Sequence, residues 1–126
     1  MKNILIISII ILILAVIFVI HQGAKTKSPG SDHLIWSEFE KKAQDKNTKV
    51  IDIRTFSEVS NGKLFDDALE IDYYTSDFEE KVSKLDPSQT YLIYCYSGSR
   101  SQSALSIFNK YNLKAYDLDD GYISVQ

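Results

Sequence analysis

The sequence is poor in the residues that build disulfides and metal sites. Its 126 residues include one cysteine and two histidines. A single cysteine excludes an intramolecular disulfide, and too few ligands remain for a structural zinc site, which takes about four Cys or His side chains. A basic excess is also missing, because the net charge is −3 at pH 7, and this argues against a dedicated nucleic-acid binder. We therefore expect no metal, no cofactor and no nucleic-acid partner.

One long hydrophobic run is present, at the N-terminus. Residues 4–20 are 17 consecutive uncharged residues, among which Ser8 is the only polar one. A helix of this length spans roughly 26 Å, near the lower limit for crossing the core of a bilayer. The run is longer than the apolar part of a cleaved signal peptide, which has about 7–15 residues, and no clear small-x-small cleavage site follows it. We favour an uncleaved signal anchor over residues 1–21 to a cleaved signal peptide.

The remaining residues predict a linker and one folded domain. Residues 22–31 contain Gly, Ser, Pro and Lys without apolar periodicity, which is typical of a linker. Residues 32–126 are long enough for a single domain. Lys2 and the α-amine precede the hydrophobic run, and Lys25 and Lys27 follow it, so the positive-inside rule gives little guidance on orientation. The very short N-terminal flank favours a domain on the extracytoplasmic side of the membrane.

Strand and helix patterns alternate along the predicted domain. Apolar residues at helical spacing predict helices over residues 35–46, 76–85 and 99–111, with a helical turn at 55–60. Strands are expected over residues 49–53, 68–71, 91–96 and 114–118. Ser76 and Glu79 have the spacing of a capping box at a helix start. This alternation predicts an α/β fold in which helices cover both faces of a parallel sheet.

The segment most informative about function begins at Cys95. An apolar strand ends at this cysteine, a loop of small residues follows, and a helix begins about five residues later. Ligands of parallel sheets bind beyond the carboxyl ends of the strands, which would place Cys95 at the floor of a pocket. Gly98 allows the loop to curl so that its N–H groups converge on the sulfur. Together with the helix N-terminus and Arg100, these groups favour a nucleophilic thiolate.

A structural role is the alternative for this cysteine. An arbitrary cysteine at a strand end is most often a small buried hydrophobe. The glycine and serine residues of the loop, the arginine and the strand-to-helix setting favour a reactive thiol here. The candidate substrate-binding residues form the loop itself: Tyr96, Ser97, Gly98, Ser99 and Arg100. They would hold an anionic substrate or a terminal persulfide sulfur, so that no histidine base is required.

The same loop resembles the active-site loop of the rhodanese family, in which a catalytic Cys precedes a loop that ends in Arg and Ser. Residues 50–58, with Asp52, Arg54 and Glu58, resemble the upstream Asp-x-Arg signature of that family. Residues 62–72 resemble its Gly-His-Ile segment and the strand after it. The likeness covers nearly all of residues 33–123. It implies a rhodanese-like three-layer fold with a central, mostly parallel five-stranded sheet flanked by helices.

The length of the loop favours sulfur chemistry within this resemblance. Four residues separate Cys95 from Arg100. The sulfurtransferases of this fold have that shorter loop, whereas the related phosphatases have five intervening residues and a cradle wide enough for phosphate. The resemblance implies that Cys95 takes a sulfane sulfur from thiosulfate, a small sulfur-containing anion, or from a persulfide donor. A Cys95 persulfide then passes that sulfur to a thiol or other nucleophilic acceptor.

Two charged residues at the end of the strand predicted over residues 49–53 are supporting candidates. By the resemblance, Asp52 lies at the end of a strand beside Cys95 and helps to order the active loop, and Arg54 forms ion pairs next to it. A purely structural ion pair is the alternative for both residues, and it is favoured for Arg54. Glu58 is expected to be structural. Strand alternation directs the side chains of Tyr94 and Tyr96 away from the face that carries Cys95.

Several departures from the family pattern leave other functions open. Lys63 replaces the usual histidine of the family, and Asp120-Gly121 replaces a pair of glycines near the C-terminus. One alternative is a catalytically weak module that binds partners or relays sulfur within a complex. A phosphatase or arsenate reductase of the same fold is a second alternative, disfavoured by the loop length. A Cys–His hydrolase is the third, and it is disfavoured because both histidines lie before the domain or at its edge.

Overall fold

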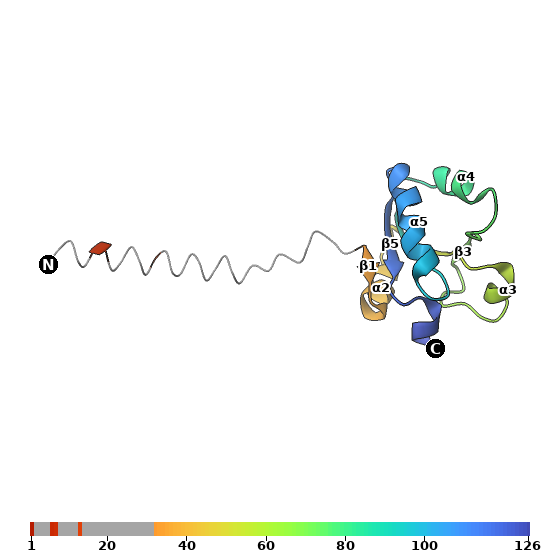
Figure 1. Cartoon of the computed structure of the whole chain (residues 1–126), viewed down its shortest axis with the longest axis horizontal. Helices are drawn as coiled ribbons and strands as arrows, with labels where there is room; N and C mark the ends of the chain where they lie inside the picture. The colour runs from red at the N-terminus through yellow and green to blue at the C-terminus, as the bar shows by residue number, and fades with distance from the viewer. Residues whose placement is uncertain (2–5, 8–12, 14–31) are drawn as a thin grey trace. The chain divides into compact units, whose positions relative to one another are not determined.

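The computed structural model describes residues 1, 6, 7, 13 and 32–126, and Figure 1 shows the chain. Most of the predicted anchor, residues 1–21, and all of the predicted linker, residues 22–31, lie outside these described residues. Among the residues that the structure describes, no helix is both long enough and apolar enough to cross a membrane.

Five parallel strands form a single sheet, as the alternating pattern predicted. Their order across the sheet is β1 (His33–Leu34), β5 (Lys114–Leu118), β4 (Thr90–Tyr94), β2 (Thr48–Asp52) and β3 (Leu69–Glu70). Every described pairing is parallel. The apolar strand β4 lies in the middle and pairs with β2 along its whole length, so the residue that follows it, Cys95, emerges at the centre of the sheet.

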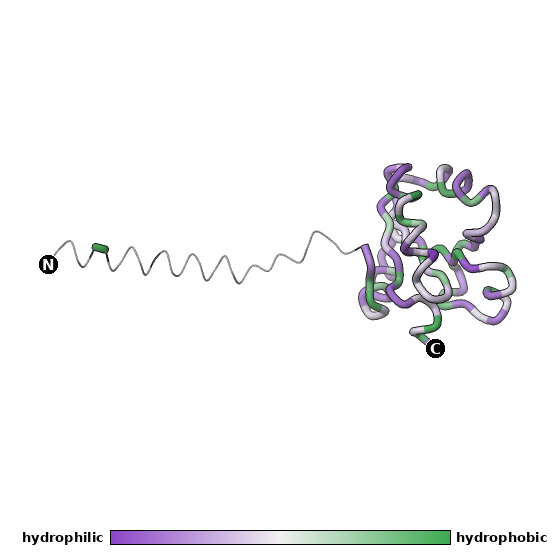
Figure 2. Tube along the Cα trace, in the orientation of Figure 1, coloured by the Kyte–Doolittle hydropathy of each residue, from purple (hydrophilic) through white to green (hydrophobic). Residues whose placement is uncertain are grey.

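Helices cover both faces of this sheet. On one face, α4 (Phe78–Ser83) and α5 (Ser99–Lys110) pack against a buried cluster that includes Ile93 and Cys95. On the other face, α2 (Trp36–Ala43) and the short 3₁₀ helix η1 (Tyr122–Val125) pack around Leu92 and Tyr94. Hydrophobic and hydrophilic residues alternate along the flanking helices (Figure 2), as expected for helices with one buried face. The three-layer α/β prediction is confirmed.

The predicted elements match the observed ones most closely where the apolar pattern is strong. Strand β5 has the predicted bounds, and α5 begins at the predicted residue. Strand β1 was not predicted, because its two residues become a strand only by pairing with β5. A short helix, α3 (Phe56–Val59), occupies the predicted helical turn.

The predicted capping box at Ser76 and Glu79 is wrong. Helix α4 begins later, after Asp77, and its N-cap side chain makes no capping hydrogen bond. Glu79 instead pairs with Lys110 and accepts a hydrogen bond from the hydroxyl of Tyr111, two partners from α5 and its end. Tertiary contacts therefore compete successfully with the local cap.

Candidate active site

Cys95 lies immediately after β4 and is fully buried, with 0% of its surface exposed. Strand alternation directs its side chain toward α5, whereas Tyr94 faces α2, as predicted. The backbone N–H of Gly98 donates a hydrogen bond to Cys95 Sγ over 3.1 Å. The hydroxyl of Ser101 lies 3.7 Å from the same sulfur. Both donors favour negative charge on the sulfur, because each can hydrogen-bond to a thiolate.

A left-handed residue makes this loop possible. Gly98 has φ 91° and precedes the first residue of α5, so the chain turns sharply and the N–H of Gly98 points back at the sulfur. A Cβ atom at this position would lie 3.2 Å from the backbone nitrogen of Asp120. The loop therefore needs glycine for its backbone angle and for its close approach to the C-terminal segment. Tyr96, Ser97 and Ser99 are exposed on the outer side of the loop.

Arg100 is held by a carboxylate from another part of the chain. Its guanidinium donates two hydrogen bonds to Glu58, over 2.8 and 2.6 Å. These bonds hold the pKa of Glu58 at about 2, against the opposing effect of burial and with further help from Thr55. The same bonds raise the pKa of Arg100. Arg100, the second residue of α5, is thus held in place by Glu58, which partly balances its charge.

The C-terminal segment supports the loop from behind. The backbone N–H of Tyr122 donates to the carbonyl of Cys95 over 2.9 Å, and that of Ile123 donates to the carbonyl of Tyr96 over 3.0 Å. Gly121, with φ 64°, packs so closely that an added Cβ would lie 2.6 Å from the nitrogen of Gly98. Residues 121–123 therefore set the conformation of the cysteine loop.

A family profile described as rhodanese-like domain matches residues 36–126. The chain belongs to the rhodanese-like domain family. A search of curated proteins found no match.

Solved structures share the fold of this rhodanese-like domain. A rhodanese-related protein from Thermoplasma volcanium is 23% identical, with a TM-score of 0.64 over 73% of this chain and 87% of that one. A rhodanese-like domain protein from Staphylococcus aureus is 20% identical, with a TM-score of 0.62 over 71% of this chain and 85% of that one. A Rhodopseudomonas palustris protein described as a possible tyrosine phosphatase is 16% identical, with a TM-score of 0.62 over 73% and 76% of the two chains. Identities this low establish the fold and no activity.

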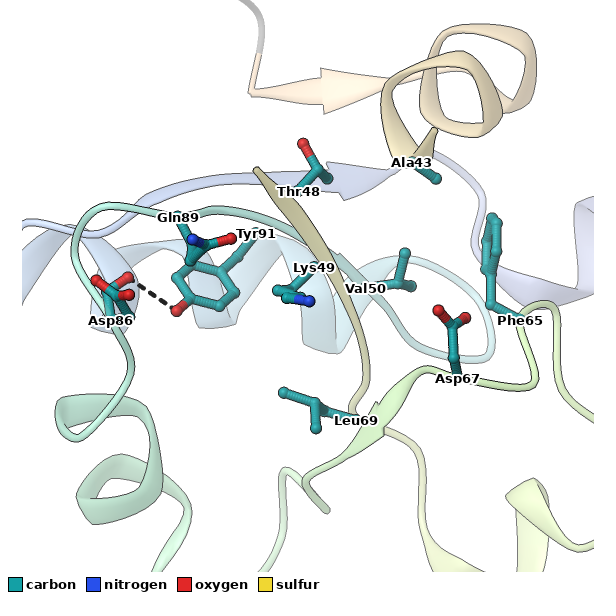
Figure 3. Close-up of a pocket in the computed structure, with 10 residues that line it drawn as sticks. All are labelled: Ala43, Thr48, Lys49, Val50, Phe65, Asp67, Leu69, Asp86, Gln89 and Tyr91. Atoms are coloured by element: carbon teal, nitrogen blue, oxygen red, sulfur yellow. Dashed lines mark hydrogen bonds between the residues drawn. The ribbon is translucent and has the colours of Figure 1, made fainter. Parts of the chain in front are cut away.

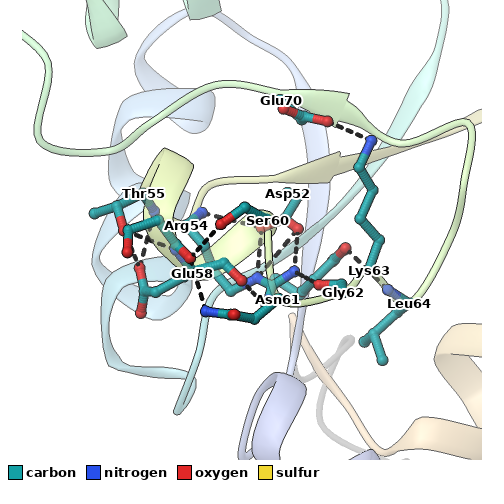
Figure 4. Close-up of polar contacts among 12 residues, drawn as sticks. Asp52, Arg54, Thr55, Glu58, Ser60, Asn61, Gly62, Lys63, Leu64 and Glu70 are labelled. Carbon is teal, nitrogen blue, oxygen red and sulfur yellow. Dashed lines mark hydrogen bonds and ion pairs between the residues drawn. The ribbon is translucent and has the colours of Figure 1, made fainter.

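The supporting candidates Asp52 and Arg54 form a buried ion pair (Figure 4), with 2.7 Å between Arg54 Nη2 and Asp52 Oδ2. Burial alone would lower the pKa of Arg54, but the hydrogen bonds and charge of Asp52 raise it. Asp52 is in register with Tyr94, so it lies on the face of the sheet opposite Cys95.

Arg54 links this ion pair to the segments around the active loop. Its Nη2 also donates to the carbonyl of Gly62 over 2.7 Å. Its guanidinium lies 3.9 Å from the ring centre of Tyr122, the residue whose N–H supports Cys95. Arg54 therefore reaches the cysteine loop indirectly, through the C-terminal segment.

A cavity of about 520 Å³ lies away from the cysteine, along the beginning of β2 and beside β3 (Figure 3). Its lining residues come from the start of β2, the start of β4 and the segment around β3, and they include Lys49, Asp67 and Tyr91. Cys95 and its loop do not contribute to this lining. Cys95 was expected at the floor of a pocket, but its surface is fully buried. Among the residues that the structure describes, no group of three or more His, Cys, Asp or Glu side chains is placed to hold a metal.

Sequence reasoning did not identify three groups at this site. Glu58 was expected to be structural, yet it is the partner of Arg100, 42 residues away in the sequence. Ser101 and Asp117 were given no role, yet the hydroxyl of Ser101 connects the cysteine to the carboxylate of Asp117. The acidic position in the upstream signature was the available signal for Glu58. No local pattern marks Asp117, because its neighbours come from two other elements.

Proposed function

We propose that this rhodanese-like domain is a sulfurtransferase in which Cys95 carries sulfane sulfur as a persulfide. The supporting observation is the four-residue loop between Cys95 and Arg100, which curls so that the N–H of Gly98 lies 3.1 Å from the sulfur. A cradle of this size suits a single sulfur atom bound to Cys95. The donors around it stabilise the negative charge that the sulfur carries before and after each transfer.

The reaction takes two displacement steps at sulfur. The Cys95 thiolate attacks the outer sulfur of thiosulfate, so that an S–S bond forms to Cys95 while the S–S bond of thiosulfate breaks. Sulfite leaves with the bonding electron pair. An acceptor thiolate then attacks the terminal sulfur of the persulfide, and Cys95 leaves as a thiolate.

The remaining loop residues have binding roles in this proposal. Arg100 attracts an anionic donor to the mouth of the loop, while its two bonds to Glu58 fix its direction. Tyr96, Ser97 and Ser99 are exposed beside it and contact the donor or the acceptor. Asp52 and Arg54 act as supporting residues through Tyr122.

Intact-mass measurement tests the proposal directly. The full-length chain, purified in detergent, is incubated with thiosulfate, and we expect one added sulfur that cyanide removes as thiocyanate. The Cys95→Ser variant is expected to gain no sulfur. The Ser103→Ala variant, altered on the exposed side of α5, is the matched control and is expected to gain one. Sulfur transfer at the wild-type rate by Cys95→Ser would refute the proposal.

Complete burial of Cys95 favours a second candidate, a sulfur-relay module that is loaded only by a protein partner. Such a partner would open the loop and present its own persulfide. This candidate predicts no loading by thiosulfate but full loading by a protein persulfide. Phosphatase activity is disfavoured by the loop length, and hydrolysis of a phosphate ester that requires Cys95 would reinstate it.

We further propose that residues 4–20 anchor the domain to a membrane, with the domain on the extracytoplasmic side. Support comes from the 17 uncharged residues of this run. The full-length chain is then expected to stay with membranes after alkaline carbonate extraction and to be digested by protease added to cells whose outer barriers have been removed. Release by carbonate, or protection from the protease, would contradict the corresponding part of this proposal.

A further inference from the structure

A chain of polar side chains lies beneath Cys95 and extends to the surface. Ser101 Oγ, fully buried, is 3.7 Å from Cys95 Sγ and 3.4 Å from Asp117 Oδ2. Asp117 is 1% exposed, and its other carboxylate oxygen, Oδ1, contacts Nδ1 of His33. His33 is 35% exposed at its side chain. Three elements, α5, β5 and β1, thus connect the sulfur to solvent.

The register of the sheet explains why these groups meet. Asp117 pairs with Ile93, two residues before Cys95, so its side chain points to the same face as the sulfur. His33 pairs with Asp117 at the neighbouring edge strand. Ser101 lies in the first turn of α5, where its hydroxyl also reaches the carbonyl of Gly98 over 3.0 Å. The arrangement is therefore determined by the fold itself.

The single hydroxyl proton of Ser101 has three competing acceptors. It can be donated to the carbonyl of Gly98, to the carboxylate of Asp117 or to the sulfur of Cys95. A negative charge on Asp117 attracts this proton away from the sulfur. The same charge also disfavours a thiolate nearby, since like charges in a buried setting repel strongly.

Other charged groups act on Asp117. Burial raises the pKa of Asp117, His33 opposes that effect, and the exposed Asp119 reinforces it. Arg100 is positive, and its ion pair with Glu58 balances its charge. The side chain that reaches Asp117 from the neighbouring strand is His33, whose Nδ1 contacts Oδ1 of the carboxylate. Histidine is also the side-chain type that ordinarily changes charge between about pH 5 and 8.

We infer that His33 and Asp117 are positioning residues that control the thiolate of Cys95 through Ser101. The inference rests on the proposed role of Cys95 as the sulfur nucleophile. Imidazolium at His33 neutralises Asp117, which leaves the hydroxyl of Ser101 available to the sulfur and removes the repulsion of a thiolate. Loss of the His33 proton restores the negative charge beneath Cys95 and returns the sulfur toward the thiol.

Titration of the thiolate by its ultraviolet absorbance tests this inference. Cys95 is the only cysteine, so the absorbance difference between each full-length protein and its Cys95→Ser counterpart reports this group alone. We expect His33→Gln to lower the ratio of thiolate to thiol at neutral pH by roughly five- to tenfold, and Asp117→Asn to raise it by a similar factor. Ser103→Ala is the control on the same helix and is expected to match the wild type.

The double variant gives the decisive comparison. In the Asp117→Asn background, His33→Gln is expected to change the ratio less than twofold, because the charge that His33 balances is gone. An undiminished His33 effect in that background, or wild-type titration curves for both single variants, would overturn the inference. If Asp117→Asn does not fold, His33→Lys replaces it: a permanent cation should restore the wild-type ratio at neutral pH, and a ratio equal to that of His33→Gln would overturn the inference.

These outcomes are separable from the proposed function. The titration contains no sulfur donor, so the His33 effect can be present in a protein that never forms a persulfide. Conversely, a Cys95 persulfide can form while the two positioning variants titrate like the wild type. Each result therefore rejects one proposal without deciding the other.

Discussion

The carboxylate of Glu58 makes two kinds of contact. It accepts a hydrogen bond from the guanidinium of Arg100. It also caps α3, because it accepts a hydrogen bond from the backbone N–H of Thr55 over 2.8 Å. The hydroxyl of Thr55 in turn accepts from the N–H of Glu58. Loss of the carboxylate would therefore release Arg100 and weaken α3, the helix that contains Glu58.

The lowered pKa of Glu58 predicts a defined acid sensitivity. Its pKa is about 2 in the folded protein, against an ordinary value of 4.5, so its stabilising effect is complete above about pH 4.5 and disappears as the pH falls toward 2. We expect Glu58→Gln to reduce the free energy of unfolding by about 1–3 kcal/mol near neutral pH and by much less at the acid end. Urea unfolding at a series of pH values measures this.

The control for Glu58 is Glu80→Gln, which removes an exposed pair with Lys84 on α4. Exposed pairs at this spacing contribute only about 0.3–0.5 kcal/mol. A Glu58→Gln effect that stays constant from neutral pH to the acid end would contradict the pH assignment.

At the scale of the elements, helix starts differ in how they are capped. Helix α3 has a complete capping box formed by Thr55 and Glu58, whereas α4 makes no side-chain cap and leaves Ser76 outside the helix. We expect Thr55→Ala to cost about 1 kcal/mol of folding stability and Ser76→Ala to stay within about 0.5 kcal/mol. Urea unfolding of both variants at neutral pH tests this, and equal losses would show that the caps were assigned wrongly.

The strong elements were predictable, and of the two shortest strands only β3 was, since a strand was expected over residues 68–71 and β3 is Leu69–Glu70. Strands β4 and β5 and helix α5 have apolar patterns long enough to identify their type, and α5 and β5 were placed correctly at their starts. Strands β1 and β3 have two residues each, and they exist only through their partners in the sheet. The cysteine loop was predictable because Cys95, Gly98 and Arg100 are close in sequence.

The contacts that sequence reasoning missed join residues that are far apart in the sequence. His33 and Asp117 are 84 residues apart, and no spacing rule connects them. Their meeting depends on β1 taking the edge position beside β5, which in turn depends on the order of all five strands. Asp52 was expected to help order the cysteine loop from a neighbouring strand, and this role stays a prediction. Its register with Tyr94 directs it to the other face of the sheet.

At the scale of the whole molecule, the C-terminal segment and the cysteine loop form one packed unit. Gly121 contacts the backbone of residues 96–98, and an added Cβ would lie within 2.8 Å of three of their atoms. We expect Gly121→Ala to cost about 1–3 kcal/mol of folding stability, because backbone atoms cannot move aside as a flexible side chain would. Chemical denaturation of the full-length chain measures the loss.

The neighbouring residue supplies the control for Gly121. Asp120 has φ 60°, a left-handed angle that glycine adopts more easily. Asp120→Gly is therefore expected to change stability by less than about 1 kcal/mol, since relief of the backbone angle offsets the greater freedom of the unfolded chain. A Gly121→Ala variant as stable as the wild type would show that the loop has another packing available.

The enclosure of Cys95 has a kinetic consequence for any sulfur that it carries. No acceptor reaches a fully buried atom without an opening of the loop. In the proposed reaction, the loop must open before each transfer of sulfur from Cys95. At high acceptor concentration, this opening would limit the rate of transfer, which would then no longer depend on the acceptor. If Cys95 carries sulfur as proposed, that sulfur is protected from other thiols between openings. The time for which the domain keeps it would then depend on the stability of residues 96–100.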